Sequence, residues 1–370
     1  MVWYAWHSLV QGKGRLALAI GGVALALALI VVLDAIFLGV ERQITAYVDH
    51  AGADVIVSQA GVRTMHMAAS TLPAALADQV RALPEVASVT PVLYAGDVMR
   101  VGETRASVYV IGLPPDADAG QPWQIVAGTA LPAPGGAVID RQVAAGAGLG
   151  LGDFVTLLGR PFRIDGLSVG TATLTGGVAI VTFADFTALQ GGDPTISFLF
   201  VRVAPGASPL TVSEGIGATV AGVTAQTRQR FAAEERALIR DMGTDLISIM
   251  NVFGFLVGLA VMALTVYIAT LSRRAELGML KALGARNVYL YRVVLAQALA
   301  SVGLGFALAI ALTLALAALL PRLGSNLALA LGAEGLVKAL VASLVIAGLS
   351  ALLPIKQIAG LDPAMVFGGK

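Results

Sequence analysis

The sequence contains no cysteine, and only three of its 370 residues are histidines. Without cysteine there can be no disulfide, no thiolate metal site and no cysteine nucleophile. The histidines, His7, His50 and His66, are too scattered for a histidine-rich metal site. The phosphate-binding pattern G-x-x-x-x-G-K-[ST] is also missing. Because no set of nucleophile, base and orienting residue stands out, we expect a chain that is not an enzyme and holds no cofactor of its own.

Charge is equally scarce in this chain. Charged residues make up 13% of it and hydrophobic residues 57%, and the formal net charge is +1. An ordinary soluble protein is roughly 25% charged. The mean hydropathy is +0.83, so much of the apolar surplus must face lipid. Nucleic acid is not expected as a partner, because phosphate binding needs a concentrated basic face.

Apolar runs long enough to cross a membrane occur in four places. A bilayer core about 30 Å thick needs roughly 20 apolar residues in a helix. The runs cover residues 16–38, 246–271, 293–320 and 336–355. The first exceeds the roughly 7–15 apolar residues of a signal peptide, and no small-residue cleavage site follows it. We therefore expect four transmembrane helices, the first of them an uncleaved anchor.

Lysine and arginine set the expected orientation, because they accumulate in short cytoplasmic segments. They cluster before the first run, between the second and third, and after the fourth, so both termini and residues 273–292 are expected in the cytoplasm. Trp3, Tyr4 and Trp6 fit a segment lying in the membrane interface. The expected division is 1–40, interfacial segment and first helix; 41–240, extracytoplasmic domain with helical stalks; 241–272, second helix; 273–292, cytoplasmic segment; 293–320, third helix; 321–335, outer loop; and 336–370, fourth helix and C-terminus.

The large insert between the first two runs has the composition of a separate α+β domain. Prolines cluster in it, and short runs rich in Val, Ile, Phe and Thr end at Gly, Pro or Asp. Strands are expected at residues 53–58, 88–94, 107–112, 136–140, 154–158, 163–167, 177–183 and 197–203, and helices at 71–83 and 140–148. The glycine-dense stretch 146–152 is expected to be a loop that needs positive φ angles.

A highly charged, helix-forming stretch closes the insert. Residues 228–240 read RQRFAAEERALIR and lead into the second apolar run. We expect one continuous helix that projects from the membrane, with residues 41–49 doing the same above the first span. The alternative is a solvated surface helix that ends before the membrane. Two helical stalks would hold the outer domain above the bilayer.

The segment between the second and third runs carries an apolar face under positive charge. Leu277, Leu280 and Leu283 recur at helical spacing, and Gly284 is a typical helix stop. Its basic residues are Arg273, Arg274 and Lys281. The residues alone leave two interpretations open, a short amphipathic helix along the inner membrane face and an ordinary basic loop.

This segment resembles the R-R-x-E-[IL]-G-x-L-[RK]-A-[LI]-G-A pattern of the FtsX/MacB superfamily of ABC transporter permeases. The run Gly52–Val57 resembles that family's first extracytoplasmic strand, and Leu361-Asp362-Pro363-Ala364 resembles its C-terminal signature. The resemblance implies a permease homodimer in the bacterial cytoplasmic (inner) membrane. It also implies two copies of a separate ABC ATPase, which would bind the ATP and Mg. An extracytoplasmic adaptor or substrate protein and membrane lipids are further expected partners.

In this family the segment acts as a coupling helix that docks on the ATPase. The resemblance carries that role to Arg273, Arg274, Glu276, Gly278, Lys281 and Gly284. The implied mechanism is mechanotransmission, in which ATP binding moves the stalks and the outer domain. The implied function is export or extraction of a hydrophobic or amphiphilic substrate such as heme, a lipid or a lipopeptide. The alternative is an FtsX-like signalling subunit that transports nothing and activates an extracytoplasmic partner.

The layout and the ending Gly368-Gly369 resemble the HrtB and DevC branches, which draws attention to two carboxylates. Asp34, inside the first span, and Glu41, at its outer end, are candidate substrate-binding residues, because ionisable groups in a membrane often serve function. The alternatives are that Asp34 reaches outer water or caps a neighbouring helix, and that Glu41 has no role in binding. Met65-His66-Met67 could hold copper or heme, but a flexible loop tip dipping toward the membrane is the favoured interpretation.

Overall fold

A computed structural model describes residues 13–66, 68–101, 104–173, 176–190, 195–272, 274–283, 285–323 and 325–359. The chain divides into two compact units. The helical unit comprises Met1–Leu38, Gly243–Leu319 and Leu329–Lys370, and the outer unit comprises Gly39–Met242 and Leu320–Ala328. The expected interfacial segment around Trp3 and the C-terminal signature lie outside the described residues.

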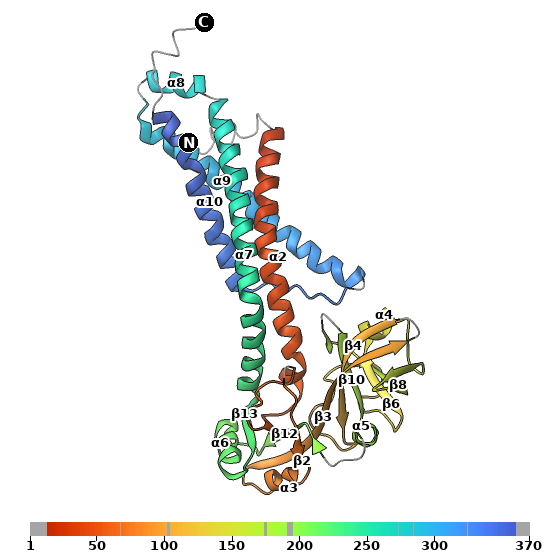
Figure 1. Cartoon of the computed structure of the whole chain (residues 1–370). Helices are drawn as coiled ribbons and strands as arrows, with labels where there is room; N and C mark the ends of the chain where they lie inside the picture. The colour runs from red at the N-terminus through yellow and green to blue at the C-terminus, as the bar shows by residue number, and fades with distance from the viewer. Residues whose placement is uncertain are drawn as a thin grey trace. The chain divides into compact units, whose positions relative to one another are not determined.

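Four long helices pass through the helical unit, and Figure 1 shows α9 crossing the other three obliquely. They are α2 (Lys13–His50), α7 (Arg228–Leu271), α9 (Asn287–Leu319) and α10 (Ala333–Ala359). Each contains a stretch long and apolar enough to cross a membrane, so the expected set of four apolar helices is confirmed. The short helix α8 (Arg274–Ala282) lies between α7 and α9 in the chain, and a 3-10 turn, η1 (Leu320–Leu323), follows α9.

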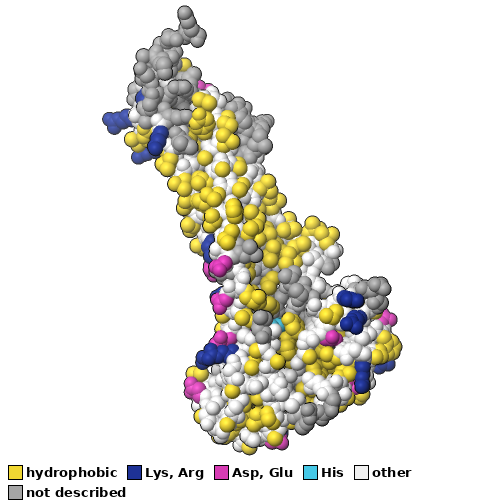
Figure 2. Space-filling model, in the orientation of Figure 1, with side chains coloured by type: hydrophobic (Ala, Val, Ile, Leu, Met, Phe, Trp, Pro, Cys, Tyr) yellow, Lys and Arg dark blue, Asp and Glu magenta, His cyan; other side chains and the backbone are white. Residues whose placement is uncertain are grey.

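The core of the helical unit contains residues from all four long helices. Val23 of α2, Met262 of α7, Val294 of α9 and Ile346 of α10 belong to one buried cluster. Small residues let the helices approach closely, and a Cβ added to Gly305 would lie 2.9 Å from the Val23 side chain. The outer surface of these helices is covered by hydrophobic side chains (Figure 2). Such a surface is suited to lipid, where apolar side chains need no polar cover.

The outer unit is built on an eleven-stranded mixed sheet with the order β13-β1-β12-β3-β4-β10-β6-β8-β5. Its strands are β1 (Val55–Gln59), β3 (Val86–Val101), β4 (Thr104–Leu113), β5 (Ile125–Gly128), β6 (Gly136–Asp140), β7 (Phe154–Leu157), β8 (Arg160–Ser168), β9 (Ala172–Thr173), β10 (Gly176–Thr182), β12 (Phe198–Val203) and β13 (Val223–Thr227). A two-stranded sheet pairs β2 (Leu72–Pro73) with β11 (Thr195–Ile196). The helices are α3 (Leu76–Arg81), α4 (Arg141–Gly146), α5 (Phe183–Leu189) and α6 (Pro209–Thr219).

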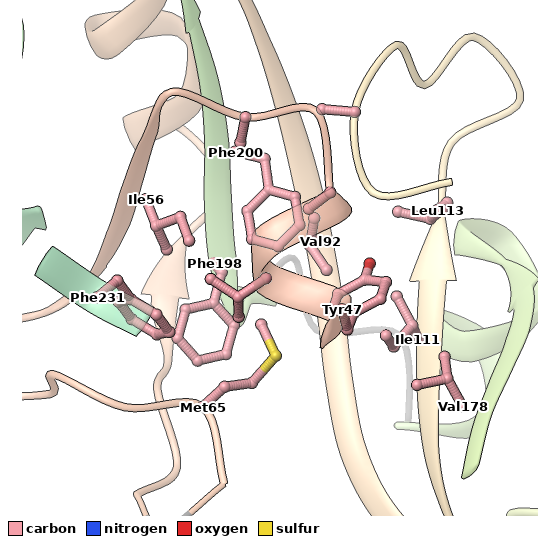
Figure 3. Packing of buried hydrophobic residues seen from close by; sticks show 14 of the residues in the cluster. Tyr47, Ile56, Met65, Val92, Ile111, Leu113, Val178, Phe198, Phe200 and Phe231 are labelled. Carbon is pink, nitrogen blue, oxygen red and sulfur yellow. The ribbon is translucent and has the colours of Figure 1, made fainter. Parts of the chain in front are cut away.

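The long strand β3 joins two parts of this sheet. Its first half, up to Val92, pairs with β12, and its second half, from Leu93, pairs with β4. The ends of α2 and α7 add large side chains to the core beside it. Figure 3 shows Tyr47 of α2 and Phe231 of α7 in one cluster, and Phe231 lies 6.2 Å from the Phe198 ring between ring centroids. Helix ends and sheet therefore share one core.

Every strand expected from the sequence overlaps an observed strand, and residues 228–240 do continue into the second apolar helix. The helix expected at 71–83 was too long. Leu72 and Pro73 form strand β2 because they pair with Thr195–Ile196, and the helix begins only at Leu76. In the glycine-dense loop, Gly148 and Gly152 have φ angles of 70° and 89°, as expected.

Candidate functional site

The sequence region with the family-like motif forms helix α8. Leu280 packs against the core of the helical unit and Gly278 is buried, so one side of α8 is held by the other helices. The helix ends where the Leu283 N–H donates to the Met279 carbonyl and the Ala285 N–H to the Leu280 carbonyl. A short helix is therefore present, as the first of the two interpretations expected. Arg273 and Gly284 lie outside the described residues.

The free side of α8 combines a carboxylate with apolar side chains. Glu276 is exposed, and Met279 and Leu283 are 56% and 79% exposed. Their i, i+3, i+7 spacing places them on one helix face. Only some apolar side chains of this region therefore pack in the core, since Leu280 packs inward while Leu283 is exposed. Figure 2 shows Lys and Arg side chains near this end of the helices. In the sequence around α8, Lys281 is half-buried, and Arg286 and Arg292 are exposed.

Asp34 of α2 lies in the helical unit beside Asn251 of α7. The Asn251 side-chain amide donates to Asp34 Oδ1 at 3.3 Å. Asp34 Oδ2 and Asn251 Oδ1 are both buried and have no hydrogen-bond partner among the described residues. The backbone of α10 comes close, since a Cβ added to Gly335 would lie 3.1 Å from the Asp34 Cβ. Two acceptor oxygens without donors can receive hydrogen bonds from a bound group.

Glu41 lies in the outer unit and is only 3% exposed. Its carboxylate accepts two hydrogen bonds from Arg240 of α7, from Nε at 2.7 Å and from Nη2 at 3.2 Å. A bidentate pair of this kind is among the stronger charge-assisted contacts. The structure thus gives Glu41 a partner that the sequence reading did not identify. Its suggested part in substrate binding stays a prediction.

Two further arginines of α7 hold the end of α2. Arg236 Nη2 donates to Asp49 Oδ2 at 2.8 Å and to Thr45 Oγ1 at 3.4 Å, and the Arg228 guanidinium donates to the Asp49 carbonyl. On α2 the partners recur every four residues, which places them on one face. Together with Arg240–Glu41 they form a contact that we call the stalk clamp. In the sequence, the signal for this contact is that its polar residues recur every four positions on both helices, at 41, 45 and 49 and at 236 and 240.

Glu235 of α7 is fully buried and anchors the segment around Met65. Its carboxylate accepts hydrogen bonds from the Met65 N–H, from the His66 N–H at 3.3 Å and from His66 Nδ1 at 3.1 Å. Met65 is itself buried in the core. The expectation of a flexible loop tip here is therefore wrong, because a buried carboxylate holds the segment down. No cluster of three or more metal-ligating side chains occurs among the described residues, and Met67 lies outside them.

Aromatic rings continue outward from His66. Its imidazole packs edge-on against Tyr109 at 4.6 Å between ring centroids, and Tyr109 stacks on Tyr94 at 5.5 Å. Burial raises the pKa of the Tyr94 phenol, and the neighbouring Tyr109 and Glu235 raise it further. The Tyr94 hydroxyl is buried without a partner among the described side chains and backbone groups. Tyr94 and His66 line a pocket of about 430 Å³.

One hydrolase-like pattern, G-x-S-x-G, is present at Gly166–Gly170 and was not recognised in the sequence. Its Ser168 lies at the end of β8 and is 2% exposed. The Ser168 hydroxyl shares a hydrogen bond with Thr171 Oγ1 at 2.8 Å, and Thr171 donates to Asp140. No described histidine contacts this group of buried hydroxyls, whose hydrogen bonds to one another and to Asp140 lie at the end of β8.

Comparisons with known proteins agree with this geometry. Residues 16–219 match the family described as MacB-like periplasmic core domain, and residues 248–363 match the family described as FtsX-like permease C-terminal. The chain is 26% identical over 381 residues to the uncharacterized ABC transporter permease Rv0072 of Mycobacterium tuberculosis (strain H37Rv), with 100% of both chains covered. It is 25% identical over 376 residues to the uncharacterized ABC transporter permease Mb2592 of Mycobacterium bovis, again with 100% of both covered.

Two solved structures of outer domains are also similar. The periplasmic region of MacB from Actinobacillus actinomycetemcomitans matches with 16% identity and a TM-score of 0.37, over 49% of this chain and 92% of that one. The extracellular domain of the noncanonic ABC-type transporter YknZ from Gram-positive bacteria matches with 10% identity and a TM-score of 0.36, over 47% of this chain and 99% of that one.

The first family match alone covers more than half of the chain, and the second covers the last three apolar helices together with α8. An ABC permease is the membrane subunit of a transporter and works with an ATPase partner. The chain therefore belongs to the FtsX/MacB superfamily of ABC transporter permeases, as a multi-pass inner-membrane protein.

Proposed function

We propose that this permease works by mechanotransmission, with ATP binding in a partner ATPase moving the outer domain through α7. The observation that carries the proposal is the continuity of this helix. It begins at Arg228, directly after strand β13, and runs for 44 residues without a break to Leu271, just before α8. At about 1.5 Å per residue it is roughly 66 Å long. An unbroken helix resists bending, so displacement at one end reaches the other.

The stalk clamp joins α7, the proposed lever, to α2 in the outer unit. Glu41–Arg240 and Asp49–Arg236 join α2 and α7 over two helical turns. Glu41 is buried while the Arg240 side chain is 58% exposed, so the carboxylate is shielded from water and the guanidinium is only partly so. The two helices therefore move as a pair in the outer unit. Phe231 and Tyr47 carry this motion into the core shown in Figure 3.

The face of α8 formed by Glu276, Met279 and Leu283 is the proposed docking surface for the ATPase. Exposed apolar side chains beside a carboxylate suit a protein groove better than water. In this arrangement Arg273, Arg274, Gly278, Lys281 and Gly284 keep the coupling role implied by the family motif. The permease acts as a homodimer with two ATPase copies, which bind ATP and Mg, and α8 and both termini face the cytoplasm.

The proposed cargo is a hydrophobic or amphiphilic molecule extracted or exported from the membrane. Asp34 and Asn251 support this, because they offer two buried acceptor oxygens that have no donor among the described residues, in a helical unit with a large apolar core. A polar head group with hydrogen-bond donors would satisfy them. Glu41, which belongs to the stalk clamp, remains a candidate for contact with this head group.

The test uses the full permease with its ATPase in lipid nanodiscs, and the readout is the ATPase rate. Glu276→Lys should lower the permease-dependent ATPase rate at least fivefold without lowering the melting temperature. Glu214→Lys makes the same charge change on an exposed position of α6 and should leave the rate unaltered. An unchanged rate in Glu276→Lys would sink the proposed docking surface.

The same ATPase assay tests the proposed cargo in a separate measurement. Hemin, a phospholipid or a lipopeptide should stimulate the ATPase, and Asp34→Ala should remove that stimulation while keeping the basal rate. If none of the three stimulates but an extracytoplasmic protein partner does, the chain is an FtsX-like signalling subunit and the transport proposal is wrong. If stimulation survives in Asp34→Ala, this carboxylate has only a structural role.

A further inference from the structure

Asp34 of α2 and Asn251 of α7 share one hydrogen bond inside the helical unit. The Asn251 side-chain N–H donates to Asp34 Oδ1 at 3.3 Å. Each side chain then has one oxygen left, Asp34 Oδ2 and Asn251 Oδ1. Both atoms are buried, and neither has a hydrogen-bond partner among the described residues. An ionised Asp34 therefore leaves the pair with two buried acceptors and no donor, which native proteins rarely tolerate.

Asp34 also lacks a positive partner among the side chains that the structure describes. It is the only charged residue in the apolar run 16–38, and no described Lys or Arg forms an ion pair with it. On α10, the Lys338 ammonium pairs with Glu334 at 3.0 Å, and on α7 the carboxylate of Asp245 is exposed. An ionised carboxylate without a paired charge is costly in apolar surroundings, and such groups become neutral instead.

The start of α10 lies beside Asp34 and gives independent evidence on its charge. A Cβ added to Gly335 would lie 3.3 Å from Asp34 Oδ2. Gly335 is in the first turn of α10, which begins at Ala333, and the N–H groups of a first turn have no partner within their helix. An ionised carboxylate beside a helix start normally accepts hydrogen bonds from these N–H groups. Asp34 Oδ2 accepts none of them, as expected for an oxygen that already bears a proton.

One proton on Asp34 Oδ2 would satisfy both oxygens. The Oδ2–H group is then a donor, and Asn251 Oδ1 is an acceptor on the very group that already bonds to Asp34. A carboxylic acid and a carboxamide can share two hydrogen bonds in one closed ring, from N–H to the carboxyl oxygen and from O–H to the amide oxygen. The carboxyl in such a ring is neutral, so it needs no positive partner.

We propose that the Asp34–Asn251 pair is a proton-binding site, and that Asp34 is protonated in the permease without cargo. The proton joins α2 to α7 inside the helical unit. A cargo head group that uses the same two oxygens has to replace it, and a primary ammonium group does so with balanced charge. The O–H bond of Asp34 breaks, the proton passes to water, and the ammonium N–H groups donate to the carboxylate and to Asn251 Oδ1. Only this exchange rests on the proposed function.

Infrared spectroscopy of the full chain in lipid nanodiscs at pH 7 detects the proton directly, because a protonated carboxyl has a C=O band apart from those of carboxylates and amides. The wild type should show this band, and Asp34→Asn should lack it. Asp34→Asn keeps the ring, since its amide donates to Asn251 Oδ1 and accepts from Asn251 Nδ2, so it should melt at the wild-type temperature. A wild type without the band, or a band that survives in Asp34→Asn, would overturn the proposal.

Three further variants locate the proton. Asn251→Leu removes the amide, so the band should move to higher wavenumber, because the O–H group no longer bonds to the amide oxygen. Asp245→Asn repeats the Asp34→Asn substitution at an exposed position of α7 and should keep the band. Lys338→Gln removes the ammonium of α10 and should also keep it. An unmoved band in Asn251→Leu, or a lost band in either control, would contradict the ring.

Two probes with the same apolar tail test the exchange at constant pH. Dodecylamine hydrochloride should abolish the band of the wild type, because its ammonium group replaces the proton. Dodecanol, which is uncharged, should leave the band in place. If the band survives dodecylamine, the proton site stands and the exchange is wrong. None of these spectra needs the ATPase, so the proton site can fail while the proposed transport holds, and the reverse.

Discussion

At the scale of single residues, two buried carboxylates of the outer domain are held by specific partners. Glu235 is enclosed by donors from Met65 and His66, and Asp140 accepts from Thr171. A buried carboxylate without such donors would cost several kcal/mol (roughly 3–5 after loss of one partner). These contacts fix single loops in place, and each joins residues that the chain order keeps apart.

Position 39 of α2 has no room for a side chain, which explains the glycine there. A Cβ added there would lie 1.8 Å from the Ala328 carbonyl oxygen, which belongs to the backbone and cannot turn aside. Gly39→Ala should therefore destabilise the protein by about 1–3 kcal/mol, as overpacking does. The measurement is the melting temperature of the full protein in detergent.

A control on the same helix separates this clash from helix propensity. A Cβ added to Gly21 meets nothing within 4 Å, so Gly21→Ala should leave stability unchanged or raise it by up to about 1 kcal/mol. If Gly39→Ala is as stable as Gly21→Ala, the contact between α2 and the segment 325–328 does not exist as described.

Single-residue roles were the hardest to predict from the sequence. Asp34 stood out as a charge in an apolar run, but its partner Asn251 lies 217 residues further on. Likewise the triplet Met65-His66-Met67 indicated a metal or a loop tip, and only folding brings Glu235 beside it. Local patterns identify an unusual side chain, whereas its partner depends on tertiary structure.

At the scale of elements, the stalk clamp should be measurable as a coupling energy. A double-mutant cycle with Glu41→Gln and Arg240→Gln should give on the order of 1–2 kcal/mol, because Glu41 is buried and the pair is bidentate. The reference is the exposed pair Arg63–Glu234, at 3.8 Å, for which a cycle should give close to zero. Equal values for both pairs would show that the clamp adds nothing beyond a surface contact.

The segment 114–123 is tied to β3 by Asp118. Burial acts to raise the pKa of this carboxyl, but hydrogen bonds from Ser88 and Thr90, its own backbone N–H and the Arg202 charge together hold it below the usual value. A lowered pKa in the folded state adds stability above the unfolded pKa of about 3.9 and loses it as the pH falls further. We expect the stability of the outer domain to fall below about pH 4.

Urea unfolding followed by tryptophan fluorescence between pH 3 and 7 tests this, with Trp123 as a reporter in the same segment. Asp118→Asn should lower stability at neutral pH and flatten the fall in acid. Asp116→Asn alters an exposed carboxylate two residues away and serves as the control. An acid slope identical in Asp118→Asn and the wild type would refute the assignment.

Elements were predicted well where the pattern was strong. The apolar runs predicted all four long helices, and the Val- and Ile-rich runs predicted eight of the eleven strands of the large sheet, all but β5, β9 and β13. Strand β13 and helix α6 went unpredicted, because β13 is rich in Thr and Gln and α6 contains Gly215 and Gly217, which are weak signals for either structure. Strand β13 is placed by pairing with β1, and α6 by packing against β13 and β1, which no local pattern reveals.

At the scale of the whole molecule, the chain is a permease in which one helix, α7, follows strand β13 and leads to the short helix α8. The sequence predicted both ends and the family, since α8 carries the motif and the charged stretch 228–240 continues into the span. It could not predict where β12 and β7 stop along β3, because strand pairing depends on tertiary structure.

The most direct test of the lever uses the absence of cysteine, because a single introduced cysteine can be spin-labelled alone. Ala221→Cys places a label on an exposed position of the outer domain. In the permease–ATPase complex, the distance between the two copies' labels should change on ATP binding. Four glycines inserted after Asp241 in α7 should abolish that change while ATP hydrolysis continues. An equal ATP-dependent change in the insertion variant, or none in the uninterrupted protein, would contradict mechanotransmission through α7.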